Sequence, residues 1–240
     1  MLIYQKDSNY ALLSSENLTS WHMEQIIEIP GDSECPDIYK LFADGDKNRP
    51  CWVISGASDR YLVGHFEVKE GGDNQRSSRI VFIQDQRAGR LHYGSVSYAG
   101  QSFFGTPEGD VKRFTWLSTL PGDPVRAGQL SIPMQMSLKS GDDRVFLCAL
   151  PADSIKQLYS NYRCYRNVKV IGAAELADGA GKPAVLPYKA LDMTVILPMA
   201  KSGRLTLSLF GFGITVDFFR NTVECGECVS PLRAGKQSAG

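Results

Sequence analysis

The sequence predicts an all-β protein. Short segments rich in β-branched and aromatic residues follow one another along the chain, and clusters of Gly, Asp, Asn and Pro separate them. A helical pattern is clear only in 152–162, where Asp153 or Ser154 is expected to cap a short helix. Regularly spaced strands without intervening helices favour a propeller, a barrel or a sandwich over a parallel α/β layout.

The predicted strands form two groups in chain order. The first group is followed by a stretch rich in Pro and Gly, 118–135, which predicts an irregular connection. The second group follows that connection, and the polar tail after it is expected to be disordered. The predicted strands are 10–15, 51–57, 60–68, 78–85 and 113–119 in the first group, and 144–150, 193–199, 204–212 and 214–219 in the second.

Length and composition limit the classes of function. The 240 residues are 43% hydrophobic and 10% aromatic, so the chain can bury a sizeable core. Its 26 basic residues balance 26 acidic ones, which argues against nucleic acid or an anionic membrane as a partner. The apolar runs are too short to span a bilayer, and the first residues lack the features of a signal peptide, so a cytoplasmic location is the default expectation.

Six cysteines are spread through a chain too long to be a small disulfide scaffold, so most are expected to be free thiols. The CGEC stretch at 225–228 has metal-ligand or redox spacing, but no second pair of cysteines lies near it. A tight turn is the favoured interpretation, with a zinc or redox site as the alternative. His65 and His92 have no metal-ligand spacing, and the sequence predicts neither a metal nor a cofactor.

Two carboxylates stand close together in GDSECPDIYKLF, at 31–42. In an extended strand, Asp32 and Glu34 would project to the same face while Cys35 pointed away. Carboxylates that share a site raise each other's pKa, which suits a general acid working near neutral pH. The alternative is an acidic surface turn without a function, because Gly, Asp, Ser and Pro are common turn residues.

Four segments, in order, resemble glycoside hydrolase family 32, which contains the invertases, inulinases and levanases. ECPDIYKL at 34–41 resembles the family's Glu-Cys-Pro-Asp motif, and 51–67 resembles the strand pair that follows it. The stretch 93–117, which contains SYAGQS, is similar to the family's Tyr-Ala-Ala/Gly-Gln-Ser/Thr-Phe segment, and 128–138 is similar to its exit from the catalytic domain. The match is good over 1–160 and looser beyond.

The resemblance implies both a fold and a reaction. The fold is a five-bladed β-propeller followed by a β-sandwich, and the reaction is retaining hydrolysis of terminal β-D-fructofuranosyl bonds in substrates such as sucrose, inulin or levan. Glu34 would be the general acid/base. Tyr98 and Gln101 would bind substrate, and Cys35 would tune the pKa of Glu34. Asp32 is not part of the family pattern, and as a neighbour in this chain it would also tune that pKa.

The resemblance also implies that parts of the family pattern are absent. The nucleophile's Asn-Asp-Pro-Asn motif and the substrate-binding Arg-Asp-Pro motif do not occur in the sequence. We therefore expect a fragment, with the last propeller blades in 1–125, a linker in 126–160 and a partial β-sandwich in 161–240. Such a chain is expected to be inactive alone and to work with a complementing N-terminal fragment. The alternatives are a carbohydrate-binding or accessory module without catalysis, or a pseudogene-like remnant.

Overall fold

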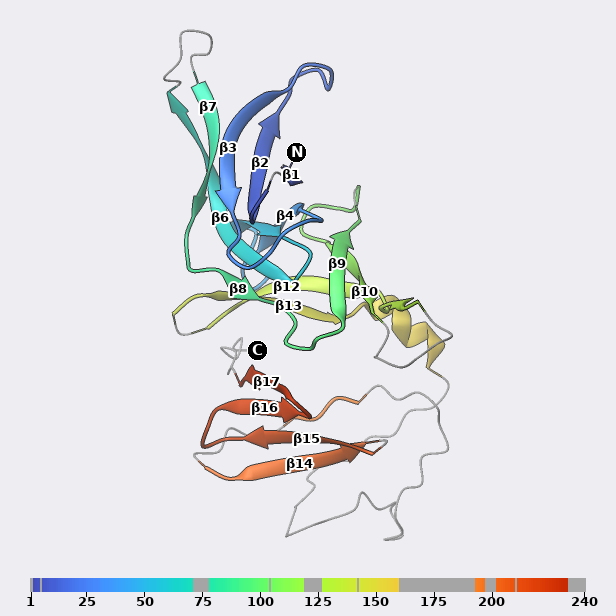
Figure 1. Ribbon diagram of the computed structural model, residues 1–240. Coiled ribbons are helices and arrows are strands. Elements are labelled where there is room, and N and C mark those ends of the chain that lie inside the picture. Colours follow the sequence, from blue (N-terminus) through green and yellow to red (C-terminus); the bar gives the residue numbers. More distant parts are fainter. Residues whose placement is uncertain are drawn as a thin grey trace.

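The computed structural model describes residues 2–4, 6–70, 78–103, 105–118, 127–141, 143–159, 193–196, 202–209 and 211–232. Antiparallel strands make up almost all of its regular structure, as the sequence predicts (Figure 1). The one described helix is a short 3-10 helix, η1 (Asp153–Leu158), preceded by Ala152. Neither Asp153 nor Ser154 caps it, so the predicted cap is wrong. No described helix is long and apolar enough to cross a membrane.

Three sheets hold the N-terminal part of the chain, and all their strand pairs are antiparallel. The first sheet has the strand order β1-β2-β3, the second β4-β5-β6-β7 with β8 on β6, and the third β11-β10-β12-β13 with β9 on β10. Their bounds are β1 Leu2–Tyr4, β2 Asn9–Ser14, β3 His22–Glu28, β4 Asp37–Phe42, β5 Pro50–Ser55, β6 Arg60–Glu70, β7 Ser78–Gln84, β8 Gly89–Arg90, β9 Ser97–Ser102, β10 Lys112–Leu117, β11 Gln129–Leu130, β12 Met134–Ser140 and β13 Val145–Pro151.

The second sheet is buried on both faces, because it lies between the other two. Ile54, Leu62 and Phe82 pack against residues of the first sheet, including Tyr10 and Ile27. On the other face, Tyr39, Leu41, Val53, Tyr61 and Val63 pack against Met136, Leu138 and Leu147 of the third sheet. Neighbouring residues in a strand point to opposite faces, so the continuous apolar run of β5 supplies both cores. Sheets stacked face to face in this way are arranged as the blades of a propeller are.

The third sheet includes residues that the sequence assigns to a connection. Within the range 126–160, residues 134–140 form β12 and residues 145–151 form β13, and β12 pairs with β10 through Lys112–Gln135 and Arg113–Met134. That part of the expected linker is therefore strand. The domain boundaries themselves stay a prediction.

A fourth sheet, β14-β15-β16-β17, lies near the C-terminus. Its strands are β14 (Arg204–Leu209), β15 (Phe212–Asp217), β16 (Thr222–Cys225) and β17 (Cys228–Pro231). The single strand predicted over 204–212 is broken, because the chain turns at Gly211 (φ 84°) and re-enters as β15. Of the strand predicted over 193–199, residues 193–196 have no regular structure and the rest lie outside the described residues. The start of the predicted β-sandwich, 161–192, also lies outside them.

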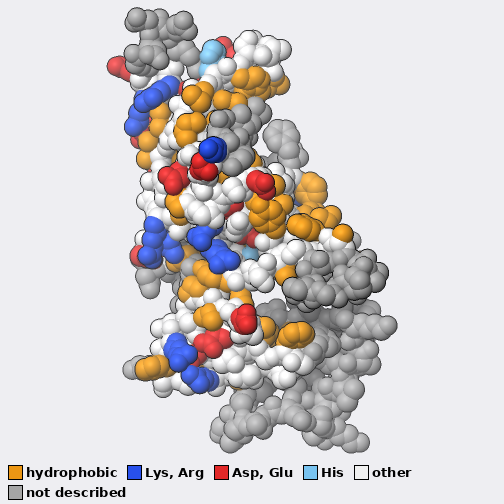
Figure 2. All heavy atoms as spheres, in the orientation of Figure 1, with side chains coloured by type: hydrophobic (Ala, Val, Ile, Leu, Met, Phe, Trp, Pro, Cys, Tyr) orange, Lys and Arg blue, Asp and Glu red, His pale blue; other side chains and the backbone are white. Residues whose placement is uncertain are grey.

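Charged side chains of both signs are interspersed on the face shown in Figure 2, in line with the net charge of zero. Side chains of one charge sign do not form a separate patch on this face.

Side chains of β3 cover the outer edge of β7. Backbone N–H groups of Ile80 and Phe82 donate to Glu24 Oε2 at 2.9 Å and to Gln25 Oε1 at 2.7 Å. The Gln25 amide also donates to the Phe82 carbonyl at 3.2 Å. Two side chains of β3 thus occupy hydrogen-bonding positions that a further strand would fill, which links the first two sheets without strand pairing.

Replacing Gln25 with leucine should lower the free energy of unfolding by about 1–3 kcal/mol, because the N–H and C=O of Phe82 lose their partners. Urea unfolding followed by tryptophan fluorescence measures this loss. Gln129→Leu, at an exposed position of β11, is the matched control and should change stability by less than about 0.5 kcal/mol. Equal effects of the two substitutions would show that the cover on β7 contributes no stability.

Candidate functional site

The stretch around Glu34 is a loop between β3 and β4 rather than an extended strand. Glu34 and Cys35 both have positive φ, 64° and 37°. The expected geometry, in which Asp32 and Glu34 project together from a strand, is therefore wrong. Left-handed backbone at non-glycine residues costs about 1–3 kcal/mol each and is concentrated at functional sites.

Asp32 is a buried anchor of this loop. Its side chain accepts backbone N–H groups from three residues: Ser33 at 2.8 Å, Ser58 at 2.8 and 3.0 Å, and Arg60 at 3.1 Å. The residue is only 3% exposed. Asp32 thus ties the loop to the turn between β5 and β6. Its predicted influence on the pKa of Glu34 stays a prediction.

Glu34 is exposed, and its carboxylate is contacted by a tyrosine from β9. Tyr98 Oη donates to Glu34 Oε2 at 2.8 Å. This hydrogen bond, with some burial and the nearby charge of Glu34, raises the pKa of Tyr98 to about 12. The phenol therefore stays protonated at neutral pH and remains a donor. The buried Tyr10 also holds the loop, because its hydroxyl donates to the Glu34 carbonyl at 3.2 Å.

The loop at 31–37 and strand β9 are joined by two further sets of hydrogen bonds. Gln101 Nε2 donates to the Cys35 carbonyl at 2.9 Å, and Asp37 accepts both the N–H and the hydroxyl of Ser102, at 2.7 and 3.0 Å. Four predicted residues, Glu34, Cys35, Tyr98 and Gln101, are thus brought together, while Asp32 lies in the same loop and is bonded elsewhere. Gln101 contacts main chain here, so its predicted contact with substrate stays a prediction.

The Cys35 thiol lies near the carboxylate of Glu34. Burial and the negative charges of Glu34 and Asp32 raise the pKa of this thiol. The thiol is therefore neutral at physiological pH. Burial also raises the pKa of Asp37, against the hydrogen bonds from Ser102 that lower it.

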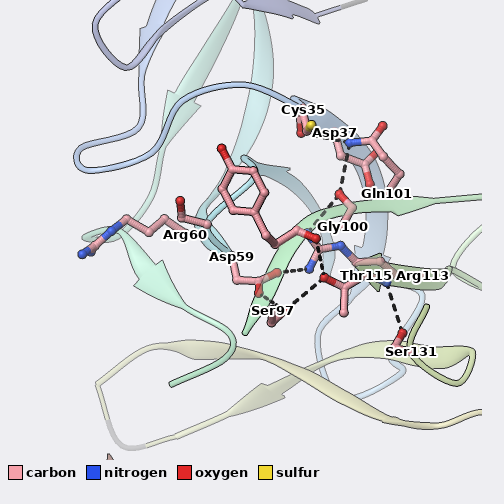
Figure 3. Close-up of polar contacts among 12 residues, drawn as sticks. Cys35, Asp37, Asp59, Arg60, Ser97, Gly100, Gln101, Arg113, Thr115 and Ser131 are labelled. Carbon is pink, nitrogen blue, oxygen red and sulfur yellow. Dashed lines mark hydrogen bonds and ion pairs between the residues drawn. The ribbon is translucent and has the colours of Figure 1, made fainter. Parts of the chain in front are cut away.

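A buried polar network behind β9, which sequence reasoning missed, supports Tyr98 (Figure 3). Arg113 Nη1 donates to Asp59 Oδ1 at 2.6 Å, and both side chains are at most 2% exposed. Arg113 Nη2 also donates to the Gly100 carbonyl at 3.1 Å. A Cβ at Gly100 would lie 2.4 Å from Arg113 Cζ, so only glycine lets β9 lie this close to the guanidinium.

Ser97 and Thr115 extend the network toward Tyr98. Ser97 Oγ donates to Asp59 Oδ2 at 2.5 Å and lies 3.0 Å from Thr115 Oγ1. Thr115 Oγ1 in turn donates to the Tyr98 carbonyl at 2.9 Å. The main chain that carries Tyr98 is therefore fixed from behind by buried charge and hydroxyl groups. The one sequence signal was a lone arginine in the apolar strand at 113–119, which requires a buried partner.

The pKa of His65, in β6, and the pKa of His92, which follows β8, are shifted in opposite directions from 6.5. Hydrogen bonds to Glu67 (3.3 Å) and Asp85 (2.7 Å) raise the pKa of His65, and burial lowers that of His92. Stability from His65 is thus present below pH 6.5 and lost as pH rises through its folded pKa. His92 removes stability as pH falls below 6.5. NMR titration of the imidazole C–H signals, assigned with His65→Gln and His92→Gln, checks this, and a reversed order would contradict it.

No cluster of three or more metal-ligand side chains occurs among the described residues. What the site offers is an exposed carboxylate on a strained loop, a protonated phenol bonded to it, and a rigid strand behind that phenol. A carboxylate held in this way can donate and accept protons.

The stacked antiparallel sheets define the chain as an all-β protein of the propeller type. No protein-family model matches the sequence. Among curated proteins, a levanase of Bacillus sp. strain L7 is 27% identical over 184 residues, and a levanase of Bacillus subtilis strain 168 is 24% identical over 186. These relatives support the resemblance of the sequence to glycoside hydrolase family 32.

Each match covers a large share of this chain but a smaller share of the relative. The levanase matches take in 67% and 68% of this chain, but 19% and 26% of the levanases. An extracellular exo-inulinase of Aspergillus niger is 24% identical over 65% of this chain and 32% of its own length. The crystal structure of an exo-inulinase from Aspergillus awamori superposes with a TM-score of 0.61 at 18% identity, over 91% of this chain and 46% of that one. The chain thus spans less than half the length of these relatives, and it shares the fold of the matched part of the exo-inulinase structure.

Proposed function

We propose that the chain supplies the acid/base part of a retaining β-fructosidase active site. The observation that carries the proposal is the 2.8 Å hydrogen bond from Tyr98 to Glu34, made in a loop held in left-handed backbone. The levanases and the exo-inulinase named above support a fructan or a related fructoside as the substrate.

In this reaction Glu34 acts twice. It first protonates the oxygen of the leaving sugar while a carboxylate nucleophile attacks the anomeric carbon of the fructosyl unit. It then takes a proton from the water that hydrolyses the covalent intermediate, so that two proton transfers return it to its starting state. Tyr98 holds Glu34 Oε2, which leaves the other carboxylate oxygen for the substrate.

The nucleophile has to come from outside this sequence, because the Asn-Asp-Pro-Asn motif does not occur in it. Two carboxyl groups about 5–5.5 Å apart are needed for retention. We therefore infer that the chain alone releases no fructose and that a complementing N-terminal fragment provides the nucleophile.

The experiment is a fructose-release assay on sucrose, inulin and levan. The chain is assayed alone, and again with a separately produced N-terminal part of the Bacillus subtilis levanase that carries the nucleophile. Release by the mixture and not by either part supports the proposal. Saturable sugar binding by the chain with no release from any mixture would favour the alternative, a carbohydrate-binding module without catalysis.

A further inference from the structure

Two cysteines face each other at the end of the fourth sheet. Cys225 ends β16, Cys228 begins β17, and the strand register pairs the one with the other. Gly226 and Glu227 form the two-residue turn between them, with Gly226 at φ 57°. Both thiols are reduced in the structure, Cys225 exposed and Cys228 partly buried. The favoured interpretation of CGEC as a tight turn is confirmed, and the turn places two thiols opposite each other.

The spacing of this pair suits a disulfide. Residues directly opposite in an antiparallel pair have Cα atoms about 4.5–5.5 Å apart and side chains on the same face. Disulfides join Cα atoms about 4.4–6.8 Å apart. The other cysteines in described strands do not face a cysteine, since Cys51 pairs with Leu41 and Cys148 with Ser137.

We propose that Cys225 and Cys228 form a reversible disulfide by exchange with a low-molecular-weight disulfide such as oxidised glutathione. The thiolate of Cys225, the more exposed of the two, attacks one glutathione sulfur, and the other leaves as a thiolate that takes up a proton. The thiolate of Cys228 then attacks the Cys225 sulfur and displaces the second glutathione. Two cysteine thiols are oxidised, one glutathione disulfide is reduced, and two protons pass to the two glutathione thiols.

The hairpin favours a disulfide that is easily reduced. Cβ atoms of opposite residues are about 4.5–5.5 Å apart, whereas a relaxed disulfide needs about 3.8 Å, so the strand ends must approach on oxidation. Exposed and strained disulfides are the labile ones. The disulfide would join β16 to β17 covalently. Cys225 also pairs with Ile214 of β15, so the bond would lie at an end of the sheet where three strands are paired.

Mass spectrometry of the full chain tests the proposal directly, because trypsin releases both cysteines in one peptide, 221–233. The folded chain is equilibrated with mixtures of reduced and oxidised glutathione, quenched with acid, alkylated with N-ethylmaleimide and digested. As the oxidised fraction rises, this peptide should lose the mass of two hydrogen atoms and take no alkyl group. The peptides that carry Cys51 and Cys148 are internal controls and should stay alkylated under the same conditions.

Two further measurements make the result specific to the hairpin. Cys228→Ser should stop the exchange at the first step and leave one glutathione on Cys225. The same equilibration in urea should shift the equilibrium toward the disulfide by on the order of tenfold, because unfolding releases the strain that the paired strands impose on the bond. Two alkyl groups at every ratio, two glutathione adducts on the peptide, or an equal equilibrium in urea would each overturn the proposal.

Discussion

Replacing Arg113 with methionine should lower the free energy of unfolding by about 3–5 kcal/mol, since Asp59 would remain as a buried carboxylate without its cation. Arg113 and Asp59 are both almost fully buried and lie 2.6 Å apart. The Gly100 carbonyl would lose its donor as well. Urea unfolding measures the loss, and Trp116 reports on it locally because it lies in β10, the strand that carries Arg113.

Asp59→Asn and the double variant test whether the loss of stability comes from an unpaired buried charge or from a change in packing. Asn tolerates the positive φ of Asp59 (61°), so Asp59→Asn removes the charge and leaves the turn intact. The double variant Arg113→Met with Asp59→Asn should cost clearly less than the sum of the single changes, because neither charge is then buried alone. Arg87→Met is the control, since Arg87 is 75% exposed and pairs with Asp143 at 3.6 Å, and it should cost about 0–1 kcal/mol. A loss below about 1 kcal/mol for Arg113→Met would contradict this account.

Strand positions were predictable where local pattern decides them. The apolar runs at 51–57 and 60–68 correspond to β5 and β6, because both faces of the second sheet are buried. β3 was missed because Glu24 interrupts its pattern. In the fold that carboxylate is buried and bonded to the N–H of Ile80, 56 residues further on. A partner so distant leaves no local trace in a single sequence.

The site was predictable only in part, for the same reason. Glu34, Cys35, Tyr98 and Gln101 were found through motif resemblance, and the structure brings them together. The left-handed backbone of Glu34 was not predictable, because contacts from Tyr10 and Gln101 hold the loop from distant strands. Likewise, the ion pair of Asp59 with Arg113 joins residues 54 positions apart, and no rule of sequence spacing predicts it.

The largest functional effect is expected from Glu34→Gln in the mixture of the chain with the levanase N-terminal part. Glutamine keeps the size of the side chain but carries no transferable proton, so fructose release should fall by about 10²–10⁴-fold, the usual contribution of a general acid/base. Sugar binding should change little, because the amide still accepts the hydrogen bond that Tyr98 donates. Initial rates and KM on sucrose, inulin and levan give the two effects separately.

Tyr98→Phe is the matched variant, because it removes only the donor to Glu34 Oε2. Its rate should fall by less than that of Glu34→Gln, because the carboxyl group that transfers the proton is still present. A leaving group that departs without protonation should restore much of the Glu34→Gln rate in the first step, since that step no longer needs an acid. If Glu34→Gln lost less than tenfold on every substrate, the acid/base would have to be sought at another carboxylate, and the loop at 31–37 would be a structural feature of the propeller.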